Sequence, residues 1–413
     1  MPMAEHVKEA EMWHQPVPWL EPLGVYLHVP FCAHRCGYCD FATVAGRDGL
    51  AERYLQALAR ELATLQQPRP VDTVFIGGGT PTHLSAQLLE RLLHMVRHWF
   101  RLEPGYEWTV EANPGTLDRT KVCLLADYGV NRISLGAQSF HRPLLHFLER
   151  QHTPEDTARA VALVRRRLDN VSLDLIFGIP GQTLADWRSD LRVALSLQPM
   201  HLSTYALTYE KGTPLWKQWR SGLVQPVSDE LERAMYEEAM DALTAEGFEH
   251  YEISNFARPC FQCRHNLIYW ANHAYWGFGL GATGYVRGTR SSNTRDLDTY
   301  LRRLEQGLPP HQYQETLDPL QRACETAMLQ IRRSIGIERE AFAKQTGWQV
   351  DSLFAEAVRR HTEAGLLEDS GRAVFLTREG KLFADLVAST FLEPCLQSAG
   401  SESVPPLRPG KDL

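Results

Sequence analysis

The chain has 413 residues, a formal net charge of -7 and 44% hydrophobic residues, which is the composition of a globular protein. At about 100–200 residues per domain, this length predicts two or three domains. The acidic balance does not favour nucleic acid as a partner, and no run approaches the ~18 apolar residues of a transmembrane segment. The first residues lack the basic start and apolar core of a secretory signal, so we expect a cytoplasmic protein.

Short β-branched or aromatic runs alternate with helical patterns over residues 24–208. The runs cover residues 24–29, 71–76, 106–112, 132–137, 171–177 and 201–208. Amphipathic patterns between them predict helices at residues 50–65, 85–100 and 187–197, and residues 153–156 favour a helix start. Strands that alternate with helices pair in parallel. Six such units fit an α/β fold, either an open doubly wound sheet or an incomplete TIM-like barrel, and both bind ligands at the carboxyl ends of the strands.

The rest of the chain departs from this rhythm. A helical pattern at residues 228–247 precedes a segment rich in cysteine, histidine, aromatic residues and glycine. Residues 316–390 predict a small helical, winged-helix-like domain, and the last residues have too little apolar content to pack. We expect an N-terminal extension, a partial barrel, a barrel-closing region, a C-terminal domain and a disordered tail, at residues 1–20, 21–215, 216–312, 313–392 and 393–413.

Three cysteines follow the first predicted strand. Cys32, Cys36 and Cys39 have the spacing Cys-x3-Cys-x2-Cys. In a reducing compartment such a group indicates metal ligation or redox chemistry rather than disulfides. Three thiolates on one loop can hold three corners of a four-iron four-sulfur cluster. The alternatives are free buried cysteines, or a zinc site that needs a fourth ligand, for which the nearby donors are His28, His34 and Asp40.

Glycine and polar residues lie at the ends of the other predicted strands. Residues 77–82 read Gly-Gly-Gly-Thr-Pro-Thr after the second strand, where absent side chains let the backbone approach a ligand. Glu111 and Gln138 follow the third and fourth strands, and Asp174 lies on the fifth. An ionised side chain within an apolar strand is unfavourable unless it has a partner. We expect these groups to line one site that bonds the hydroxyls and amides of a nucleoside.

These motifs resemble the oxygen-independent coproporphyrinogen oxidase-like branch of the radical S-adenosylmethionine (SAM) superfamily, over about residues 20–390. The resemblance rests on residues 26–32, the loop 39–41 and residues 77–82. It implies a partial TIM-like (β/α)6 barrel, a 4Fe-4S cluster on the three cysteines and SAM chelated by the open iron. The positions that it places around SAM are Tyr26, Tyr38, Gly78, Gly79, Thr80, Glu111, Gln138, Arg150, Asp174 and Ala206.

Position 41 separates two branches of this family. The oxidases carry a fourth cysteine there, whereas this chain has Phe41 and in this respect resembles the HemW-like haem chaperones. A later stretch of the form His-Asn-x2-Tyr-Trp resembles the motif that is associated with haem in that branch. Imidazole can ligate iron, and aromatic faces can lie against a flat macrocycle. The resemblance therefore implies haem contacts at His265, Asn266, Tyr269 and Trp270.

A structural alternative for this motif stays open. Its aromatic residues can close the barrel as core, with His265 as a satisfied core histidine. His250, His273 and the nearby cysteines are further candidates for the haem ligand. Cys260 and Cys263 precede the motif, but an arginine interrupts the Cys-x2-Cys-His order of a c-type haem attachment site.

The resemblance implies two main functions. The first is a haem chaperone that binds a 4Fe-4S cluster, SAM and haem and transfers haem to an acceptor protein. The second is an oxygen-independent coproporphyrinogen III oxidase of porphyrin biosynthesis, against which Phe41 argues. A haem-degrading or porphyrin-methylating radical enzyme is a third alternative, so the sequence does not decide whether the chain is an enzyme. One candidate acceptor is a respiratory-chain haem protein, reached through peripheral contact with a membrane, and one candidate assembly is a homodimer.

Overall fold

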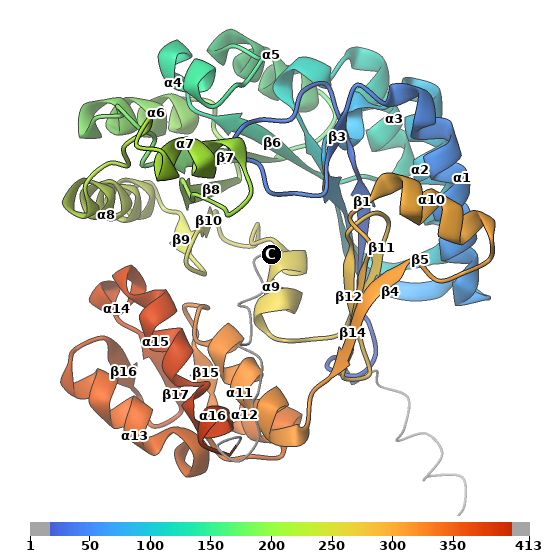
Figure 1. Cartoon of the computed structure of the whole chain (residues 1–413). Helices are drawn as coiled ribbons and strands as arrows, with labels where there is room; N and C mark the ends of the chain where they lie inside the picture. Colours follow the sequence, from blue (N-terminus) through green and yellow to red (C-terminus); the bar gives the residue numbers. More distant parts are fainter. Residues whose placement is uncertain (1–16, 399–413) are drawn as a thin grey trace, which may run out of the picture.

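The computed structural model describes residues 17–398, and a large mixed sheet forms its centre (Figure 1). The strands of this sheet are β1 (Gly24–Val29), β4 (Arg69–Gly78), β5 (Phe100–Ala112), β6 (Arg132–Gln138), β7 (Asn170–Phe177), β8 (His201–Ala206), β9 (Glu249–His250), β10 (Asn255–Ala257), β11 (Tyr275–Phe278), β12 (Thr283–Val286), β13 (Thr289–Asn293) and β14 (His311–Thr316). Within the described residues their order is β14-β13-β12-β11-β1-β4-β5-β6-β7-β8-β10-β9. The run from β1 to β8 in this order is parallel throughout, as the alternation of strands and helices predicts.

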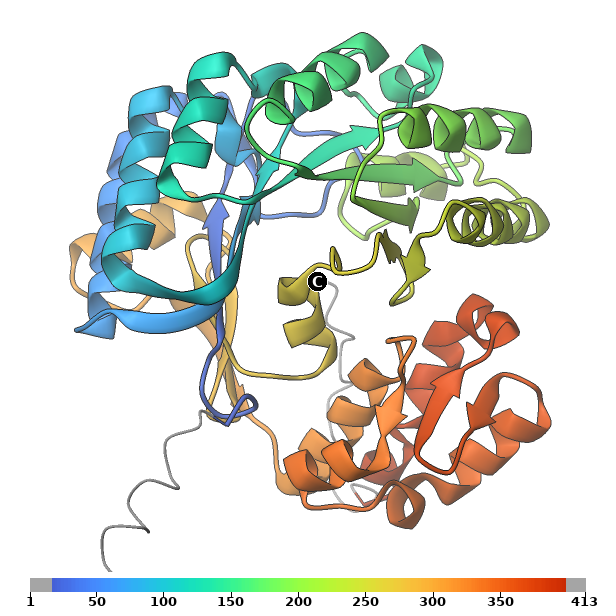
Figure 2. The same cartoon turned by 180° about the vertical axis from the view of Figure 1, so that it is seen from behind.

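Helices cover the outer side of the curved sheet. The helices of this part of the chain are α1 (Ala51–Leu62), α2 (Ala86–Trp99), α3 (Arg119–Tyr128), α4 (Arg142–Phe147), α5 (Pro154–Val164), α6 (Leu184–Ser196), α7 (Pro214–Arg220), α8 (Asp229–Ala245), α9 (Arg264–Trp270) and α10 (Leu297–Glu305). Figures 1 and 2 show α1, α2, α3, α5 and α6 along the outside, whereas α9 lies on the inner side. The predicted α/β partial barrel is confirmed, because the first and last strands of the order do not pair with each other within the described residues.

Local sequence signals begin and end these helices. Thr153 begins α5 as predicted: its side chain accepts a hydrogen bond from the Asp156 backbone N–H, and the Asp156 carboxylate accepts one from the Thr153 N–H. This reciprocal pair satisfies two backbone donors that a helix start otherwise leaves open. Gly129 ends α3 at a φ of 97°, a left-handed conformation that glycine adopts without strain.

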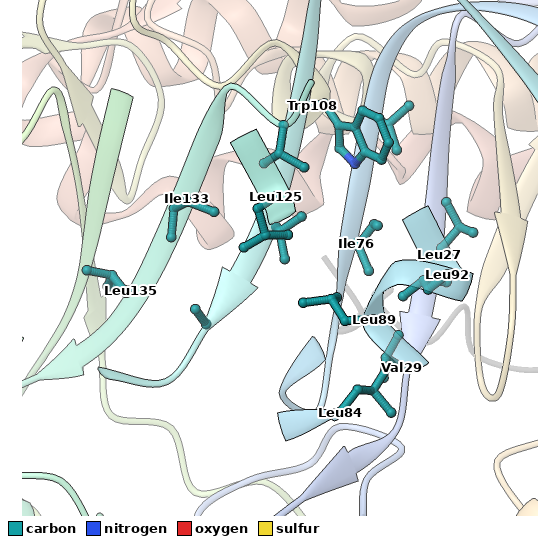
Figure 3. Close-up of a cluster of buried hydrophobic side chains, with 14 of the residues drawn as sticks. Leu27, Val29, Ile76, Leu84, Leu89, Leu92, Trp108, Leu125, Ile133 and Leu135 are labelled. Carbon is teal, nitrogen blue, oxygen red and sulfur yellow. The ribbon is translucent and has the colours of Figure 1, made fainter. Parts of the chain in front are cut away.

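The main hydrophobic core lies between the sheet and the outer helices (Figure 3). Side chains alternate along each strand, so Leu27 and Val29 of β1 face this core while Tyr26 and His28 face the inside of the barrel. Trp108 of β5 is fully buried on the outer side. Burial of each such side chain contributes about 1.5–3 kcal/mol. The outer face of the sheet therefore fixes the register of the strands, and the alternate polar residues face the inside of the barrel.

Both edges of the parallel run are extended by later parts of the chain. β11 pairs in parallel with β1, and β10 pairs antiparallel with β8. The strands after β11 continue this edge as an antiparallel ribbon. The segment between β10 and β11 crosses the open side of the barrel, and α9 is its helix (Figure 2).

The small C-terminal helical, winged-helix-like domain is also present. Its elements are α11 (Pro319–Gln330), β15 (Ile337–Glu338), α12 (Arg339–Thr346), α13 (Val350–Glu363), β16 (Leu367–Asp369), β17 (Ala373–Leu376), α14 (Arg378–Leu382), α15 (Ala384–Thr390) and α16 (Glu393–Ser398). These elements enclose a second hydrophobic core. Between residues 17 and 398, no helix combines the length and the apolar surface that a bilayer crossing requires.

The structure differs from the sequence expectation at the start of the tail. Residues 393–398 form α16, and Cys395 is buried, with its thiol donating to the Leu320 carbonyl over 3.7 Å. The hydrophobic residues of this segment show no helical periodicity. One buried side chain is enough to anchor so short a helix. Residues 399–413 of the expected tail and residues 1–16 of the expected N-terminal extension lie outside the described residues.

Candidate functional site

The three cysteines of the motif lie on the loop that leaves β1. This loop is fixed by β2 (Phe31–Cys32), which pairs with β3 (Val44–Ala45), and by the Cys39 N–H, which donates to the Cys36 carbonyl over 3.1 Å. Cys36 is buried, while Cys32 and Cys39 are half-buried. The Sγ of Cys32 lies 3.6 Å from Oγ1 of Thr80, so the cysteine loop contacts the glycine-rich loop after β4.

The three thiols lie in a buried environment beside a positive charge. Burial raises the pKa of Cys32 to about 11 and also raises the pKa of Cys39, so the metal-free thiols stay protonated. Arg150 donates to the Sγ of Cys36 over 3.9 Å and to the Gly136 carbonyl over 2.8 Å, which places a positive charge beside the future thiolates.

The glycines after β4 lie flush against the end of β1. A Cβ on Gly79 would lie 2.7 Å from the carbonyl carbon and oxygen of Pro30, and a Cβ on Gly78 would meet the His28 ring at 2.4 Å. Gly78 also has a φ of 109°, which side-chain-bearing residues rarely adopt. The backbone of this loop is therefore held next to the cysteine loop without side chains in between.

Two carboxyl groups face the same interior. Oε2 of Glu111 accepts the Gly78 N–H at 3.0 Å, and burial together with the charge of Asp174 raises the pKa of Glu111 to about 7. Asp174 accepts hydrogen bonds from Ser134 over 3.1 Å and from Ser203 over 2.8 Å, and burial raises its pKa. These partners are neutral, so both carboxyl groups keep acceptor capacity for hydroxyl or amino groups of a ligand.

The remaining predicted SAM positions lie on neighbouring strands and loops. Tyr26 places its hydroxyl 3.0 Å from Nδ1 of His28 inside the barrel, and burial raises the pKa of Tyr38 on the cysteine loop. Gln138 ends β6 with a φ of 64°, and Ala206 ends β8. Among the described residues, Nε of Arg150 is buried without a hydrogen-bond partner. The carboxyl edge of the sheet thus places the Arg150 guanidinium, the carboxyl groups of Glu111 and Asp174 and the glycine-rich backbone after β4 beside the cysteines.

The His-Asn-x2-Tyr-Trp motif lies on α9, whose His265 contacts the middle of β4. His265 is fully buried; its Nδ1 lies 2.7 Å from Oγ1 of Thr73 and its Nε2 lies 2.8 Å from the Tyr269 hydroxyl. Its ring stacks on Phe75 with 5.3 Å between centroids, and burial lowers its pKa to about 3. Both nitrogens are therefore engaged, which is the arrangement of a satisfied core histidine.

The other motif residues frame this helix. Asn266, Tyr269 and Trp270 are half-buried, and Arg332 of the C-terminal domain lies over the Trp270 ring at 5.7 Å. Cys260 is exposed while Cys263 is fully buried, so the two cysteines occupy different environments.

Glu107 of β5, which the sequence motifs did not single out, contacts the amino end of α9. The Glu107 carboxylate accepts the backbone N–H groups of Arg264 over 2.9 Å and of His265 over 3.1 Å, and the Cys263 thiol over 3.5 Å. It alternates with buried Trp108 on β5, so period-two alternation is the signal that could have placed it inside the barrel. Arg132 is a second interior residue of this kind and is only 2% exposed.

Comparison with known proteins gives three findings. Family models match the chain over residues 26–194 for the radical SAM superfamily and over residues 317–383 for the HemN C-terminal domain. A protein of Bacillus subtilis (strain 168) named heme chaperone HemW is 38% identical over 376 residues, which are 89% of this chain and 99% of that protein. The protein of that name from Escherichia coli (strain K12) is 36% identical over 90% of this chain and 99% of its own length. The structure of the coproporphyrinogen III oxidase HemN from Escherichia coli, titled a radical SAM enzyme, is similar with a TM-score of 0.79, at 21% identity over 90% of each chain, which supports the fold alone.

Proposed function

The chain belongs to the radical SAM superfamily and, within it, to the HemW family, and from this premise we propose that it is a haem chaperone that also binds a 4Fe-4S cluster and SAM. Haem is its cargo, to be passed to an acceptor protein. The observation that carries the proposal is the extent of the match: relatives named heme chaperone HemW align with about nine-tenths of this chain, through both the barrel and the C-terminal domain.

The carboxyl edge of the barrel fits the two cofactors. Cys32, Cys36 and Cys39 would bind three irons, and iron binding would displace the protons that burial holds on the thiols of Cys32 and Cys39. When bound and reduced, the cluster supplies the electron that cleaves the sulfonium of SAM. Arg150 would balance thiolate charge, because it already contacts the Sγ of Cys36.

The neighbouring groups would orient SAM. The backbone of Gly79 and Thr80 can approach the methionine end closely, because no side chain intervenes. Glu111 can accept hydroxyl hydrogens on the side of its carboxylate that Gly78 leaves open, and Asp174 is already aligned by Ser203. Phe41 is 52% exposed beside the cysteine loop and offers no thiol at the position where the oxidases carry one.

The decisive experiment combines haem titration with an oxidase assay. The purified chain is reconstituted anaerobically with iron and sulfide, and haem is added while absorbance is recorded. In parallel, coproporphyrinogen III is supplied with SAM and a reductant, and the products are analysed by mass. The proposal expects about one haem per chain, an unchanged porphyrin mass and no decarboxylated product. Formation of protoporphyrinogen would identify an oxidase, and a changed haem mass would identify a haem-modifying enzyme.

The acceptor protein and the place of transfer are expectations from the sequence alone. A respiratory-chain haem protein, a peripheral membrane encounter, a cytoplasmic location and a homodimer stay predictions. Transfer of haem from the loaded chain to a haem-free acceptor, followed by the change in absorbance, tests the chaperone step itself.

A further inference from the structure

The chain turns sharply at Gln138, where β6 ends. The φ of Gln138 is 64°, and the Ser139 N–H donates to the Ala137 carbonyl over 2.8 Å, so Gln138 is the central residue of a tight three-residue turn. The pairing of β6 with β7 also shifts register between Gly136 and Gln138. A residue that bears a side chain keeps such a left-handed conformation only where its surroundings offset the strain. Contacts from outside the turn must therefore hold Gln138 in place.

The turn directs the Gln138 side chain back over the inner face of β6. A Cβ on Gly136 would lie 2.9 Å from Nε2 of Gln138 and 3.1 Å from Nη2 of Arg150, so both groups lie against this glycine. Arg150 is anchored there, because its Nη2 donates to the Gly136 carbonyl over 2.8 Å. Ser134, two residues earlier on the same face, donates to Asp174 over 3.1 Å. The turn thus sets the Gln138 amide beside Arg150, in the site that we propose for SAM.

Asp190 holds this turn from the outer side of the sheet. It lies on α6, which covers that side (Figure 1), and it is fully buried. Its Oδ1 accepts the Phe140 N–H over 2.6 Å, and its Oδ2 accepts the Ser139 hydroxyl over 2.8 Å. The Ser139 oxygen in turn accepts the His141 N–H over 3.0 Å. One carboxyl group therefore fixes the residues that directly follow Gln138.

These hydrogen bonds are also what compensates for the burial of Asp190. An ionisable group inside a protein is unfavourable unless it has hydrogen-bond or charge partners. Within residues 17–398, the one basic side chain at ion-pair distance is His141, whose Nε2 lies 3.9 Å from Oδ1. Before the turn, His152 donates from Nε2 to the Ala137 carbonyl over 3.0 Å. The turn is therefore held on both sides of Gln138, by His152 before it and by Asp190 after it.

We infer that Asp190 is a positioning residue for SAM, because it fixes the turn that sets the Gln138 amide beside Arg150. The inference rests on the proposed function and adds a residue that acts from behind the sheet without touching the ligand. A binding group that is held in place before the ligand arrives loses less conformational freedom on binding. Gly136 has a matching role, since any side chain there would occupy the space of both groups.

The test is a SAM titration of the full-length chain after reconstitution of the cluster, with iron and sulfide measured on each preparation. Asp190→Leu keeps the branched shape, removes both acceptor oxygens and is expected to weaken SAM binding by about tenfold. Asp190→Asn keeps one oxygen for the Phe140 N–H and should stay within about threefold of the unchanged chain. Asp186→Leu is the matched control on the same helix: its carboxylate accepts from Thr183, so its loss should lower stability but not SAM affinity. Equal losses of affinity in the two leucine variants overturn the inference.

A double-mutant cycle separates positioning from general damage to the site. Gln138→Ala should itself weaken SAM binding by about tenfold. Adding Asp190→Leu should then weaken it by less than about twofold, because the amide that Asp190 positions is gone. A further tenfold loss in the double variant, or no loss in Gln138→Ala, overturns the inference.

A milder variant covers the case in which Asp190→Leu loses its iron and sulfide. Ser139→Ala removes the hydroxyl that bonds Oδ2 and should weaken SAM binding by about threefold; an unchanged affinity overturns the inference. If the unchanged chain binds no SAM, the proposed function fails together with the inference. If the unchanged chain binds SAM and Asp190→Leu, with full cluster content, binds it equally well, only the inference fails.

Discussion

Oγ1 of Thr73 lies 2.7 Å from Nδ1 of His265, and this contact joins the middle of β4 to α9 across 192 positions of sequence. Both side chains are buried, with Thr73 1% exposed and His265 fully enclosed. The Tyr269 hydroxyl holds the other nitrogen, so the imidazole is fixed between a barrel strand and its own helix. The histidine of the motif therefore fixes α9 to the barrel.

Thr73→Val is expected to destabilise the fold by about 1–3 kcal/mol, because it leaves Nδ1 of buried His265 without a partner while the volume is kept. The measurement is the free energy of unfolding in urea. Thr316→Val is the matched control, since Thr316 is exposed and its hydroxyl partner is Thr289; it should change stability by less than about 0.5 kcal/mol. Equal values for the two variants would contradict the role of the Thr73 contact.

Gly79→Ala is expected to disturb the cysteine loop. The new Cβ would lie 2.7 Å from the Pro30 carbonyl, so the backbone before Cys32 must shift. Such a clash typically costs about 1–3 kcal/mol, and a shifted loop should bind less iron and sulfide per chain after reconstitution. Gly49→Ala is the control: a Cβ there meets nothing within 4 Å, and the glycine lies beyond the same loop. Full cluster content in Gly79→Ala would show that the loop tolerates the change.

The residues at the carboxyl edge of the sheet could be predicted from sequence because they follow strands that are consecutive in the chain and pair with each other. Each predicted strand pairs with the next in parallel, so Val29 lies opposite Gly78 and their following loops meet. The contact between Cys32 and Thr80 is a direct consequence of that register. Alternation of strands and helices therefore suffices to gather the cysteines, the glycines and Glu111 at one edge.

The position of α9 could not be predicted in the same way. It depends on contacts between residues far apart in the chain, chiefly Thr73 with His265 and Glu107 with the start of the helix. The residues of the motif show that aromatic groups and an imidazole are present. They do not show which face of the helix is turned toward the barrel interior. The edge strands β9 and β10, of two and three residues, are likewise too short to carry a periodic signal.

Binding of the cluster and binding of haem should be independent of each other. Replacing Cys32, Cys36 and Cys39 together by alanine is expected to abolish cluster absorbance and to leave the haem dissociation constant within about threefold, since separated sites without shared partners are nearly additive. Iron analysis and haem titration of the same preparation provide the measurement. A loss of haem affinity of more than about tenfold in this triple variant would mean that cluster binding and haem binding are coupled.

A half-buried ion pair joins the barrel ribbon to the C-terminal domain. Arg290 of β13 donates to both carboxylate oxygens of Glu325 on α11, over 2.6 and 3.0 Å, and these side chains are only 23% and 15% exposed. Glu325→Gln should therefore lower the free energy of unfolding by about 1–3 kcal/mol. The exposed pair Arg359 and Glu356 provides the control: Glu356→Gln should cost less than about 1 kcal/mol in the same urea titration. Equal costs would show that burial adds nothing at the junction.

A buried carboxyl group should make stability depend on pH. Glu61 accepts hydrogen bonds from the Gly279 N–H, from Tyr300 and from Asn293, over 2.8, 2.5 and 2.6 Å, and burial raises its pKa to about 7. In the unfolded chain the same group titrates near its ordinary value of 4.5. Because the folded state binds the proton more tightly, its stabilising contribution is complete below the unfolded pKa and is lost as pH rises toward the folded pKa.

The corresponding variant is Glu61→Gln, which keeps the size and an acceptor oxygen of Glu61 but cannot ionise. The free energy of unfolding of the unchanged chain, relative to this variant, is expected to fall by up to about 3 kcal/mol between about pH 4.5 and pH 7 and to stay level above that range. Urea titrations of both proteins across this range measure the difference. A difference that does not change with pH would mean that Glu61 titrates alike in the folded and unfolded chain, and that its three donors fully offset the effect of burial.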